Sequence, residues 1–304
     1  WGQLMKAPQP IPYQGSKRTL APVILQFFPS KVDRVIEPFA GSAAISVAAA
    51  IQSKATQYWI NDLNEPLIDL LSAIVENPVH ISEMYSDIWS RQLGNEREYY
   101  KQVRARFNES HRPEDFLFIL ARSVKGAIRY NSNGEFNQSP DNRRKGKNPI
   151  MMAKEIHQLS RLLREKVLFS ALDYREVFAQ ARKNDLLYMD PPYQGTSQSR
   201  DKRYFSGIDF DEFVDSLQQL NKRGASYLMS YDGMLGNKVY GEQLPSVLNL
   251  HRVLIQAGRS TTSTLLGKDE VTYESLYLSE ALVEKLDYSL PSKVALKPKQ
   301  LQVL

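Results

Sequence analysis

The feature that most restricts the fold is an alternation of short apolar strands with helices in the first and last thirds of the sequence. Val32–Ile36 and Gln57–Ile60 are typical of strands, and the small-residue run Ala43–Gln52 between them is typical of a helix. The same alternation returns after a long interruption, with predicted strands at Lys166–Ser170, Asp185–Met189, Ser226–Ser230, Leu248–Ile255 and Tyr273–Leu278, and predicted helices at Tyr174–Arg182 and Phe210–Lys222. Strands that recur with intervening helices predict an α/β fold, a mostly parallel sheet covered by helices on both faces.

The middle of the chain follows a different pattern. Four amphipathic segments are predicted to be helices, Pro66–Glu76, Ile81–Gln92, Glu96–Asn108 and Glu114–Ile128, and a polar loop and one more helix follow at Asn131–Pro149 and Met151–Arg164. We therefore predict a discontinuous α/β domain made of residues 1–63 and 150–290. A helical insertion of residues 64–149 interrupts it, and residues 291–304 form a tail.

The net charge of +5 is concentrated in one stretch. Residues 91–150 contain 13 Lys and Arg against 7 Asp and Glu, a surplus of +6, whereas the remainder has 26 against 27. Such a patch attracts polyanions, but a solvated basic face without a partner has the same composition. Charge alone therefore does not choose between the two.

Several classes of protein lack support in the sequence. The chain has no cysteine, which excludes disulfides, thiolate metal sites and cysteine nucleophiles and is compatible with a reducing cytosol. The most apolar run, Ala43–Ile51, is too short to cross a bilayer, so no membrane partner is expected. The four histidines, His80, His111, His157 and His251, show no ligand spacing, so we expect no metal.

One tetrapeptide carries chemistry directly. Asp190, Pro191, Pro192 and Tyr193 follow the apolar strand that ends at Met189. The prolines stiffen the turn and leave its carbonyl groups unpaired, so a carboxylate, a carbonyl and an aromatic ring are presented together. These groups suit an exocyclic amine on a flat base, because Asp190 and Pro191 accept its two hydrogens while Tyr193 stacks on the ring.

Further polar residues stand at the ends of other predicted strands, where ligands of open α/β sheets bind. Glu37, Pro38, Phe39, Gly41 and Ser42 lie in a turn that leads into the first helix, and Gly41 permits close approach of a ligand to the backbone. Asp62 and Asp173 follow two other strands. Each fits either an acid that binds ribose hydroxyls or the N-cap of the next helix.

In this order, the motifs resemble the Dam-type DNA adenine N6-methyltransferases. Tyr13-Gln14-Gly15-Ser16-Lys17 is similar to the family's aromatic-x-G-x-K element, the Phe39 turn to its FxGxx turn, and Asp190–Tyr193 to its DPPY motif. The family places its target-recognition domain between the last two, where this chain has its basic insertion. Within it, residues 129–137 read RYNSNGEFN and resemble the family's RYNxxGEFN segment.

The resemblance implies a Rossmann-like fold with a seven-stranded sheet containing one antiparallel strand, and S-adenosyl-L-methionine as the cofactor. Cofactor contacts are implied for Tyr13, Gly15, Lys17, Glu37, Pro38, Phe39, Gly41, Ser42, Asp62, Asp173 and Asp190. The implied partner is double-stranded DNA, and we favour a monomer in the cytoplasm of a bacterium or in a phage-infected cell, associated with the nucleoid. Restriction-modification is a setting that the resemblance implies, and the sequence leaves open whether a cognate endonuclease exists.

The mechanism expected from these residues is direct methyl transfer to adenine N6. Acceptors at both amino hydrogens localise the nitrogen lone pair, and an anionic neighbour stabilises the charge that develops there, so no general base is required. The target base must flip out of the duplex, with Tyr193 and either Phe39 or Tyr204 stacking on it. Methylation of RNA or of cytosine N4 by the same motif, or a catalytically silent DNA-binding homologue, are the alternatives.

DNA contacts are expected from the insertion. Arg129, Arg143, Arg144 and Lys145 suit phosphate anchoring, and Tyr130, Asn131 and Asn137 suit contacts to base edges. The alternative is that these last three residues hold the loop's shape, which fits Asn137 best. Pro12 stands where close Dam members carry a lysine that contacts a base, and Tyr13 replaces their tryptophan. The resemblance therefore does not extend to the recognition sequence GATC.

Overall fold

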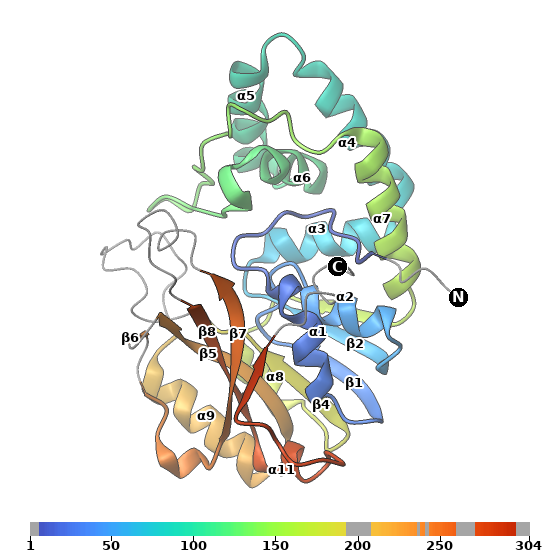
Figure 1. Cartoon of the computed structure of the whole chain (residues 1–304). Coiled ribbons are helices and arrows are strands. Elements are labelled where there is room, and N and C mark those ends of the chain that lie inside the picture. The colour runs from blue at the N-terminus through green and yellow to red at the C-terminus, as the bar shows by residue number, and fades with distance from the viewer. Residues whose placement is uncertain (1–5, 193–207, 236–237, 241–242, 260–270, 296–304) are drawn as a thin grey trace.

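A computed structural model of the chain describes residues 6–192, 208–235, 238–240, 243–259 and 271–295. One mixed sheet organises the described residues, in the strand order β3-β2-β1-β4-β5-β8-β7-β9, with β6 paired to β5 (Figure 1). Its nine strands are β1 (Val32–Glu37), β2 (Ala55–Asn61), β3 (Val167–Ser170), β4 (Asp185–Met189), β5 (Ser226–Leu235), β6 (Lys238–Tyr240), β7 (His251–Arg259), β8 (Val271–Leu278) and β9 (Lys293–Ala295).

The predicted α/β fold is confirmed, and the predicted number of strands is wrong. The seven expected strands are all present, and β8 runs antiparallel to β5 and β7. Two short strands were not expected: β6 folds back on the end of β5, and β9 pairs in parallel with β7. β9 lies in the expected tail, whose residues 293–295 therefore belong to the sheet, because backbone groups at the outer edge of β7 were still unpaired.

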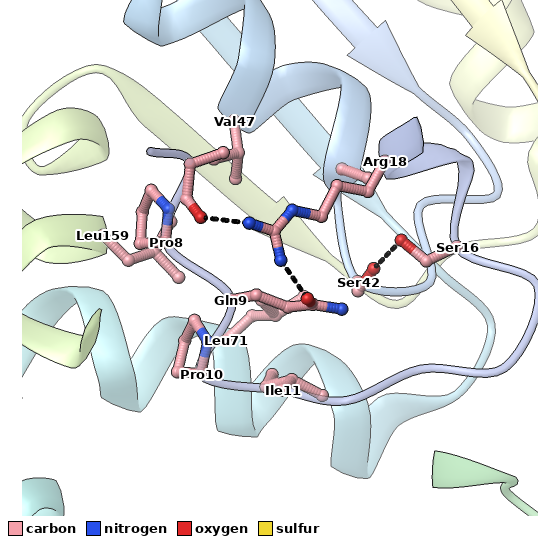
Figure 2. Close-up of a pocket in the computed structure, with 12 residues that line it drawn as sticks. Pro8, Gln9, Pro10, Ile11, Ser16, Arg18, Ser42, Val47, Leu71 and Leu159 are labelled. Atoms are coloured by element: carbon pink, nitrogen blue, oxygen red, sulfur yellow. Dashed lines mark hydrogen bonds between the residues drawn. The ribbon is translucent and has the colours of Figure 1, made fainter. Parts of the chain in front are cut away.

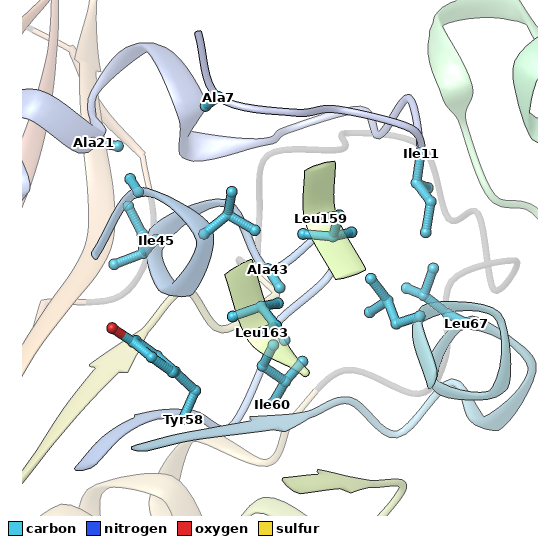
Figure 3. Close-up of a cluster of buried hydrophobic side chains, with 14 of the residues drawn as sticks. Ala7, Ile11, Ala21, Ala43, Ile45, Tyr58, Ile60, Leu67, Leu159 and Leu163 are labelled. Carbon is cyan, nitrogen blue, oxygen red and sulfur yellow. The ribbon is translucent and has the colours of Figure 1, made fainter. Parts of the chain in front are cut away.

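Alternating side chains of the strands supply two hydrophobic cores. Ile36, Trp59 and Leu187 face one side, where they pack against α8 (Tyr174–Ala179) and α9 (Phe210–Lys222). Their chain neighbours face the other side, in a larger cluster that includes α1 (Ala21–Ile24), α2 (Ala44–Ile51), α3 (Glu65–Glu76), α7 (Pro149–Leu163) and α11 (Glu280–Val283). Figure 3 shows part of this cluster, with side chains from α2, β2, α3 and α7 meeting in one place.

The helical insertion continues the larger core and has no separate one. α4 (Pro78–Arg91), α5 (Glu96–Ser110) and α6 (Pro113–Arg122) stand beyond the sheet, and α7 returns the chain to it (Figure 1). Their buried side chains Tyr85, Tyr100 and Phe116 belong to the same cluster as the residues of β1 and β4. The insertion and the sheet therefore share one continuous hydrophobic core.

Several expected boundaries differ from those in the structure, and at two of them left-handed backbone conformations give the reason. α6 ends at Arg122, six residues before Ile128, because Lys125 and Gly126 in the 3-10 turn η3 (Val124–Gly126) have positive φ angles. β7 begins at His251 because a further 3-10 turn, η4 (Ser246–Leu248), and a left-handed Asn249 precede it. The N-terminal turns η1 (Lys17–Thr19) and η2 (Leu25–Phe27), which flank α1, were not predicted.

Among the described residues, no helix has both the length and the apolar character needed to cross a membrane.

Candidate active site

The carboxyl ends of the parallel strands bring most of the predicted site residues to one edge of the sheet. Glu37 is the last residue of β1, and Asp190 directly follows β4. Asp62 directly follows β2, whereas Asp173 stands further on, at the start of α8. Tyr193, the last residue of the predicted tetrapeptide, and Tyr204 lie outside the described residues.

A lysine and two carboxylates form the centre of this edge. The Lys17 Nζ atom lies 3.0 Å from Asp190 Oδ1 and 3.7 Å from Glu274 Oε2. Burial by itself would lower the pKa of Lys17, but the charges of the two carboxylates and the hydrogen bond with Asp190 outweigh burial and raise it. Lys17 is therefore a cation held next to Asp190, the first residue of the turn after β4.

Glu274 belongs to none of the sequence motifs that indicate a site. This residue lies near the amino end of β8, and because β8 is antiparallel, that end shares an edge with the carboxyl ends of the parallel strands. Burial and the charge of Asp190 raise the pKa of Glu274, although Lys17 acts in the opposite direction. The one available signal was its place at the start of the last predicted strand.

The first turn is held by the N-terminal segment and by Asp62. The backbone N–H of Gly41 donates to Asp62 Oδ2 at 2.8 Å, and the N–H of Asn64 donates to Oδ1 at 3.0 Å. Gly41 has φ +51°, and a Cβ atom there would lie 2.7 Å from Tyr13 Cε1. Both the backbone conformation and the space require glycine at this position, which places the Tyr13 ring against the turn.

The next residues of the N-terminal segment join this turn to the insertion. Ser42 Oγ donates to Ser16 Oγ at 3.2 Å, and the N–H of Gln14 donates to the Gly126 carbonyl at 3.3 Å. Gly126 has φ +63°, and a Cβ atom there would lie 2.5 Å from the Pro12 carbonyl oxygen. The predicted cofactor element is thus enclosed between β1 and the insertion.

Glu37 is buried beneath the start of α2. Its Oε2 accepts a hydrogen bond from the Ser46 N–H at 2.7 Å, which satisfies a donor of the first helical turn, where the N-cap residue Ala43 offers no side-chain acceptor. Burial raises the pKa of Glu37 to about 7, against the effect of the Ser46 hydrogen bonds, and the charge of Asp190 adds to the rise.

A pH-dependent stability difference follows from this burial. The folded state holds a proton on Glu37 more tightly than the unfolded state does, so stability falls as the pH rises from the unfolded pKa through about 7. Glu37→Gln removes that dependence. We expect the variant to gain about 2 kcal/mol of unfolding free energy relative to wild type between about pH 5.5 and about pH 8.

Denaturant unfolding of both proteins at the two pH values measures this gain. Glu176→Gln, which removes an exposed carboxylate from α8, is the matched control, and its effect on the free energy of unfolding should be the same at both pH values. If the difference in free energy of unfolding between Glu37→Gln and wild type is the same at both pH values, Glu37 is ionised at both of them and the prediction is wrong.

The other predicted cofactor residues have diverse surroundings. Asp173 is the N-cap of α8, accepting from the Arg175 N–H at 2.9 Å, and the side-chain hydrogen bond from Arg175 lowers its pKa. The ring of Phe39 lies 5.4 Å from that of Tyr174, on the side of the sheet covered by α8 and α9. Pro38 and Pro191 are buried, whereas Gly15 and Pro192 are exposed.

Asn61 was not singled out from the sequence, yet it connects two of the turns. Its side-chain N–H groups donate to the carbonyls of Pro38 at 3.0 Å and Leu172 at 2.9 Å, and its Oδ1 accepts from the Leu172 N–H at 2.9 Å. The side chain is fully buried at the end of β2. It fixes the turn after β1 relative to the segment before α8.

A pocket adjoins the Gly41 turn on the side of the N-terminal segment (Figure 2). Its walls are mostly apolar, and Arg18 closes it by donating to Gln9 Oε1 and, at 2.9 Å, to the Ala7 carbonyl. Of the predicted cofactor residues only Ser42 lines it. The pocket is therefore a neighbour of the predicted site and does not coincide with it.

The predicted DNA-contacting residues lie together on the insertion. Tyr130 pairs with Phe136 in a narrow antiparallel turn, and its hydroxyl donates to Asn64 Oδ1 at 3.1 Å. Burial raises the pKa of Tyr130 to about 12. Arg129 is half-buried, and within the described part of the chain its Nε has no hydrogen-bond partner.

Residues 138–147, which we call the basic loop, follow this turn. Its backbone carbonyls accept hydrogen bonds from side chains of the helices: Tyr100 to Gln138 at 2.8 Å, Arg122 to Arg144 at 2.6 Å, Gln92 to Lys145 at 2.9 Å and Tyr85 to Lys147 at 2.7 Å. The backbone is thus held against α4, α5 and α6. The side chains of Arg143, Arg144 and Lys145 are exposed.

No group of three or more His, Asp or Glu side chains in the described ranges is arranged to hold a metal ion.

Comparison with known proteins identifies the family of a chain with this site. A sequence model of the D12 class of N6 adenine-specific DNA methyltransferases matches residues 13–255, which include the Lys17 element, the Gly41 turn and Asp190. The chain belongs to this family. The reaction of this D12 class methyltransferase is the site-specific transfer of a methyl group to adenine N6 in DNA.

Individual relatives agree with the family. The type II methyltransferase M1.LlaDCHI of Lactococcus lactis is 27% identical over 271 residues, which cover 84% of this chain and 90% of the relative. The type II methyltransferase M.FokI of Planomicrobium okeanokoites is 24% identical over 86% of this chain but only 41% of its own length. A DNA adenine methylase of Haemophilus influenzae is 28% identical over 65% of this chain and 68% of the relative.

Proposed function

We propose that the protein methylates adenine N6 in duplex DNA with S-adenosyl-L-methionine as the donor, at the edge formed by Lys17, Glu37 and Asp190. The observation that supports this most directly is the Lys17–Asp190 pair, 3.0 Å apart, which joins two of the family's motifs in one site. When bound, the cofactor supplies a methyl group on a sulfonium, which an amine attacks directly.

The residues present are suited to such a cofactor. The Gly41 turn presents backbone close to the Tyr13 ring, without room for a Cβ atom, and Asp62 retains lone pairs for ribose hydroxyls beyond the two hydrogen bonds it accepts. Glu274 Oε2 is buried and has no hydrogen-bond partner among the described residues. A cationic ligand at this edge would compensate that carboxylate.

The chemical task of the DPPY turn is to bind the target amine. The Asp190 carboxylate and the Pro191 carbonyl would accept its two hydrogens, so that the nitrogen lone pair is localised toward the donor. Because the amine is paired inside a duplex, the adenine would have to flip out to reach Asp190. The residues that stack on it remain a prediction, since Tyr193 lies outside the described residues.

The experiment that tests the function is analysis of the product. Duplex DNA of randomised sequence is incubated with the protein and S-adenosyl-L-methionine, digested to nucleosides and examined by mass spectrometry, and the modified sites are sequenced. We expect N6-methyladenine within a defined sequence. N4-methylcytosine as the product, or methylation of RNA in preference to DNA, would contradict the proposal.

We also propose that the insertion reads the DNA and that Asn131 and Asn137 have different roles there. Asn131 Oδ1 accepts from the N–H groups of Asn133 and Glu135, both at 2.9 Å, and its Nδ2 donates to Glu135 Oε2 at 2.8 Å. Asn137 is exposed, and its hydrogen bonds in the described part of the chain use backbone atoms. These contacts support a role for Asn131 in shaping the turn and leave the Asn137 side chain for base contact, the reverse of the assignment expected from the sequence.

These roles predict different outcomes for matched alanine variants. Asn137→Ala should change which sequences are methylated, because a base-edge contact is worth about 1–3 kcal/mol of discrimination. Asn131→Ala should lower the rate on every sequence by a similar factor, since it loosens the turn. Methylation profiles of both variants on randomised duplexes measure this, and the reverse assignment of the two profiles would show that the turn, and not Asn137, determines the sequence.

A further inference from the structure

Glu274 brings a second carboxylate to a site that already contains an ion pair. Its Oε2 atom is 3.7 Å from Lys17 Nζ, and the same ammonium is 3.0 Å from Asp190 Oδ1. The Lys17 side chain is 9% exposed and that of Glu274 25% exposed, so these charges are only partly solvated. Interactions between them are stronger than those of surface charges.

The position of Glu274 is set by the sheet and not by a flexible loop. Glu274 pairs with Gly233 of β5 on one side and with Ile255 of β7 on the other. Strands on both sides restrict the movement of its backbone, so Glu274 cannot easily withdraw from Lys17. Its Oε2 has no hydrogen-bond donor among the described residues, which leaves this negative charge without full compensation.

Methyl transfer changes the charge of the donor by one unit. The donor's sulfonium gives up its methyl group and becomes a neutral thioether, while adenine N6 gains the methyl group and releases one of its protons. The substrate cofactor and the product cofactor therefore differ mainly in one positive charge. A carboxylate held near the reacting centre favours the first over the second.

We propose that the negative charge of Glu274 strengthens binding of the cationic donor relative to binding of the neutral, demethylated product. The inference rests on the proposed use of S-adenosyl-L-methionine. Lys17 carries one positive charge and lies beside two carboxylates, so Glu274 supplies a negative charge in excess of this ammonium. The consequence is that the incoming donor competes better with the product for the site, which limits inhibition by the product.

Binding measurements with the purified full chain test this without any turnover. Isothermal titration calorimetry gives dissociation constants of S-adenosyl-L-methionine and S-adenosyl-L-homocysteine for wild type and for Glu274→Gln, which has the same shape without the charge. We expect the preference for the cation to fall about tenfold, equivalent to about 1.4 kcal/mol, through weaker binding of S-adenosyl-L-methionine. Sinefungin carries a protonated amine in place of the methylsulfonium, so its binding to Glu274→Gln should be weakened by a similar factor.

Two further variants make the result specific. Glu274→Asp keeps the charge and should keep the preference, even if both ligands bind less tightly. Glu284→Gln removes an exposed carboxylate from the segment that follows α11, and should change neither constant.

If Glu274→Gln weakens the binding of both ligands by the same factor, the inference is overturned, because Glu274 would then only position Lys17. Two unchanged dissociation constants would overturn it as well. In either case, binding of S-adenosyl-L-methionine by wild type would leave the proposed function intact. Absence of binding by wild type would contradict the proposed function itself.

Discussion

Asp190→Ala should abolish methyl transfer while leaving a folded protein. The substitution removes the acceptor for the target amine and the anion nearest to Lys17, at 3.0 Å. Both losses act on the charge that develops during transfer, and removal of one such preorganised group typically costs a factor of about 100–1,000 in rate. Single-turnover methylation of a saturating duplex measures the effect on the chemical step.

The fold should survive because Lys17 keeps a partner. Glu274 lies 3.7 Å from the ammonium and is fixed by two neighbouring strands, so the cation is not left unpaired. Thermal unfolding followed by circular dichroism checks this point. Asp215→Ala, which removes an exposed carboxylate from α9, is the matched control for rate and stability.

A variant that keeps more than about a tenth of the wild-type rate would contradict the assignment, because it would retain all but about 1.4 kcal/mol of the stabilisation of the transition state. Asp190→Asn distinguishes the two losses. An amide oxygen still accepts one amino hydrogen but carries no charge, so a partial recovery over Asp190→Ala would indicate that acceptance contributes separately from charge.

Much of the sheet could be predicted because strand signals are local. The run Asp185–Met189 is buried on both faces and reads as a continuous apolar strand, and both of its ends were predicted correctly. Once the strands were assigned, the rule that ligands bind beyond their carboxyl ends predicted that Glu37 and Asp190 would share an edge. The short strands β6 and β9 were not predicted, because three residues are too few to form a periodic pattern.

Residues whose role depends on distant parts of the chain could not be found in this way. Glu274 approaches Lys17 across more than 250 positions, and only the antiparallel direction of β8 brings it there. Asn61 is a short amide at the end of β2, a position that many polar residues can occupy. Its importance arises from hydrogen bonds to Pro38 and Leu172, in turns whose geometry the sequence does not reveal.

The basic loop illustrates the same limit and leads to the second large effect that we expect. The sequence showed its charge but not that four helix side chains, Tyr85, Gln92, Tyr100 and Arg122, bind its carbonyls. The side chains of Arg143, Arg144 and Lys145 extend from this fixed backbone and are exposed. Lys145 Nζ lies 2.8 Å from Glu96 Oε1 and Arg144 Nε lies 3.6 Å from Asp141 Oδ2, so phosphates would compete with these two carboxylates. Three cations on one fixed segment suit phosphate contacts in a duplex.

Neutralising Arg143, Arg144 and Lys145 together to glutamine should therefore weaken binding to every duplex. Each phosphate contact that is lost removes about 0.9 from the slope of log K against log salt, so three contacts would flatten the slope by up to about 2.7 units. The loss should be large at low salt and small at high salt. Binding isotherms across a salt series, with specific and random duplexes, measure both the slope and its independence of sequence.

The matched control neutralises three cations at the opposite edge of the sheet. Lys31, Lys183 and Lys222 are exposed and precede β1, β4 and β5, so they lie at the amino ends of these strands, away from Asp190. The control changes the net charge by the same three units and removes only long-range attraction, which salt screens within about 10 Å at 0.1 M. If both triple variants flatten the salt dependence equally, overall charge attracts DNA and the basic loop is not its contact. If the loop variant keeps its slope but methylates different sequences, these side chains contact bases and not phosphates.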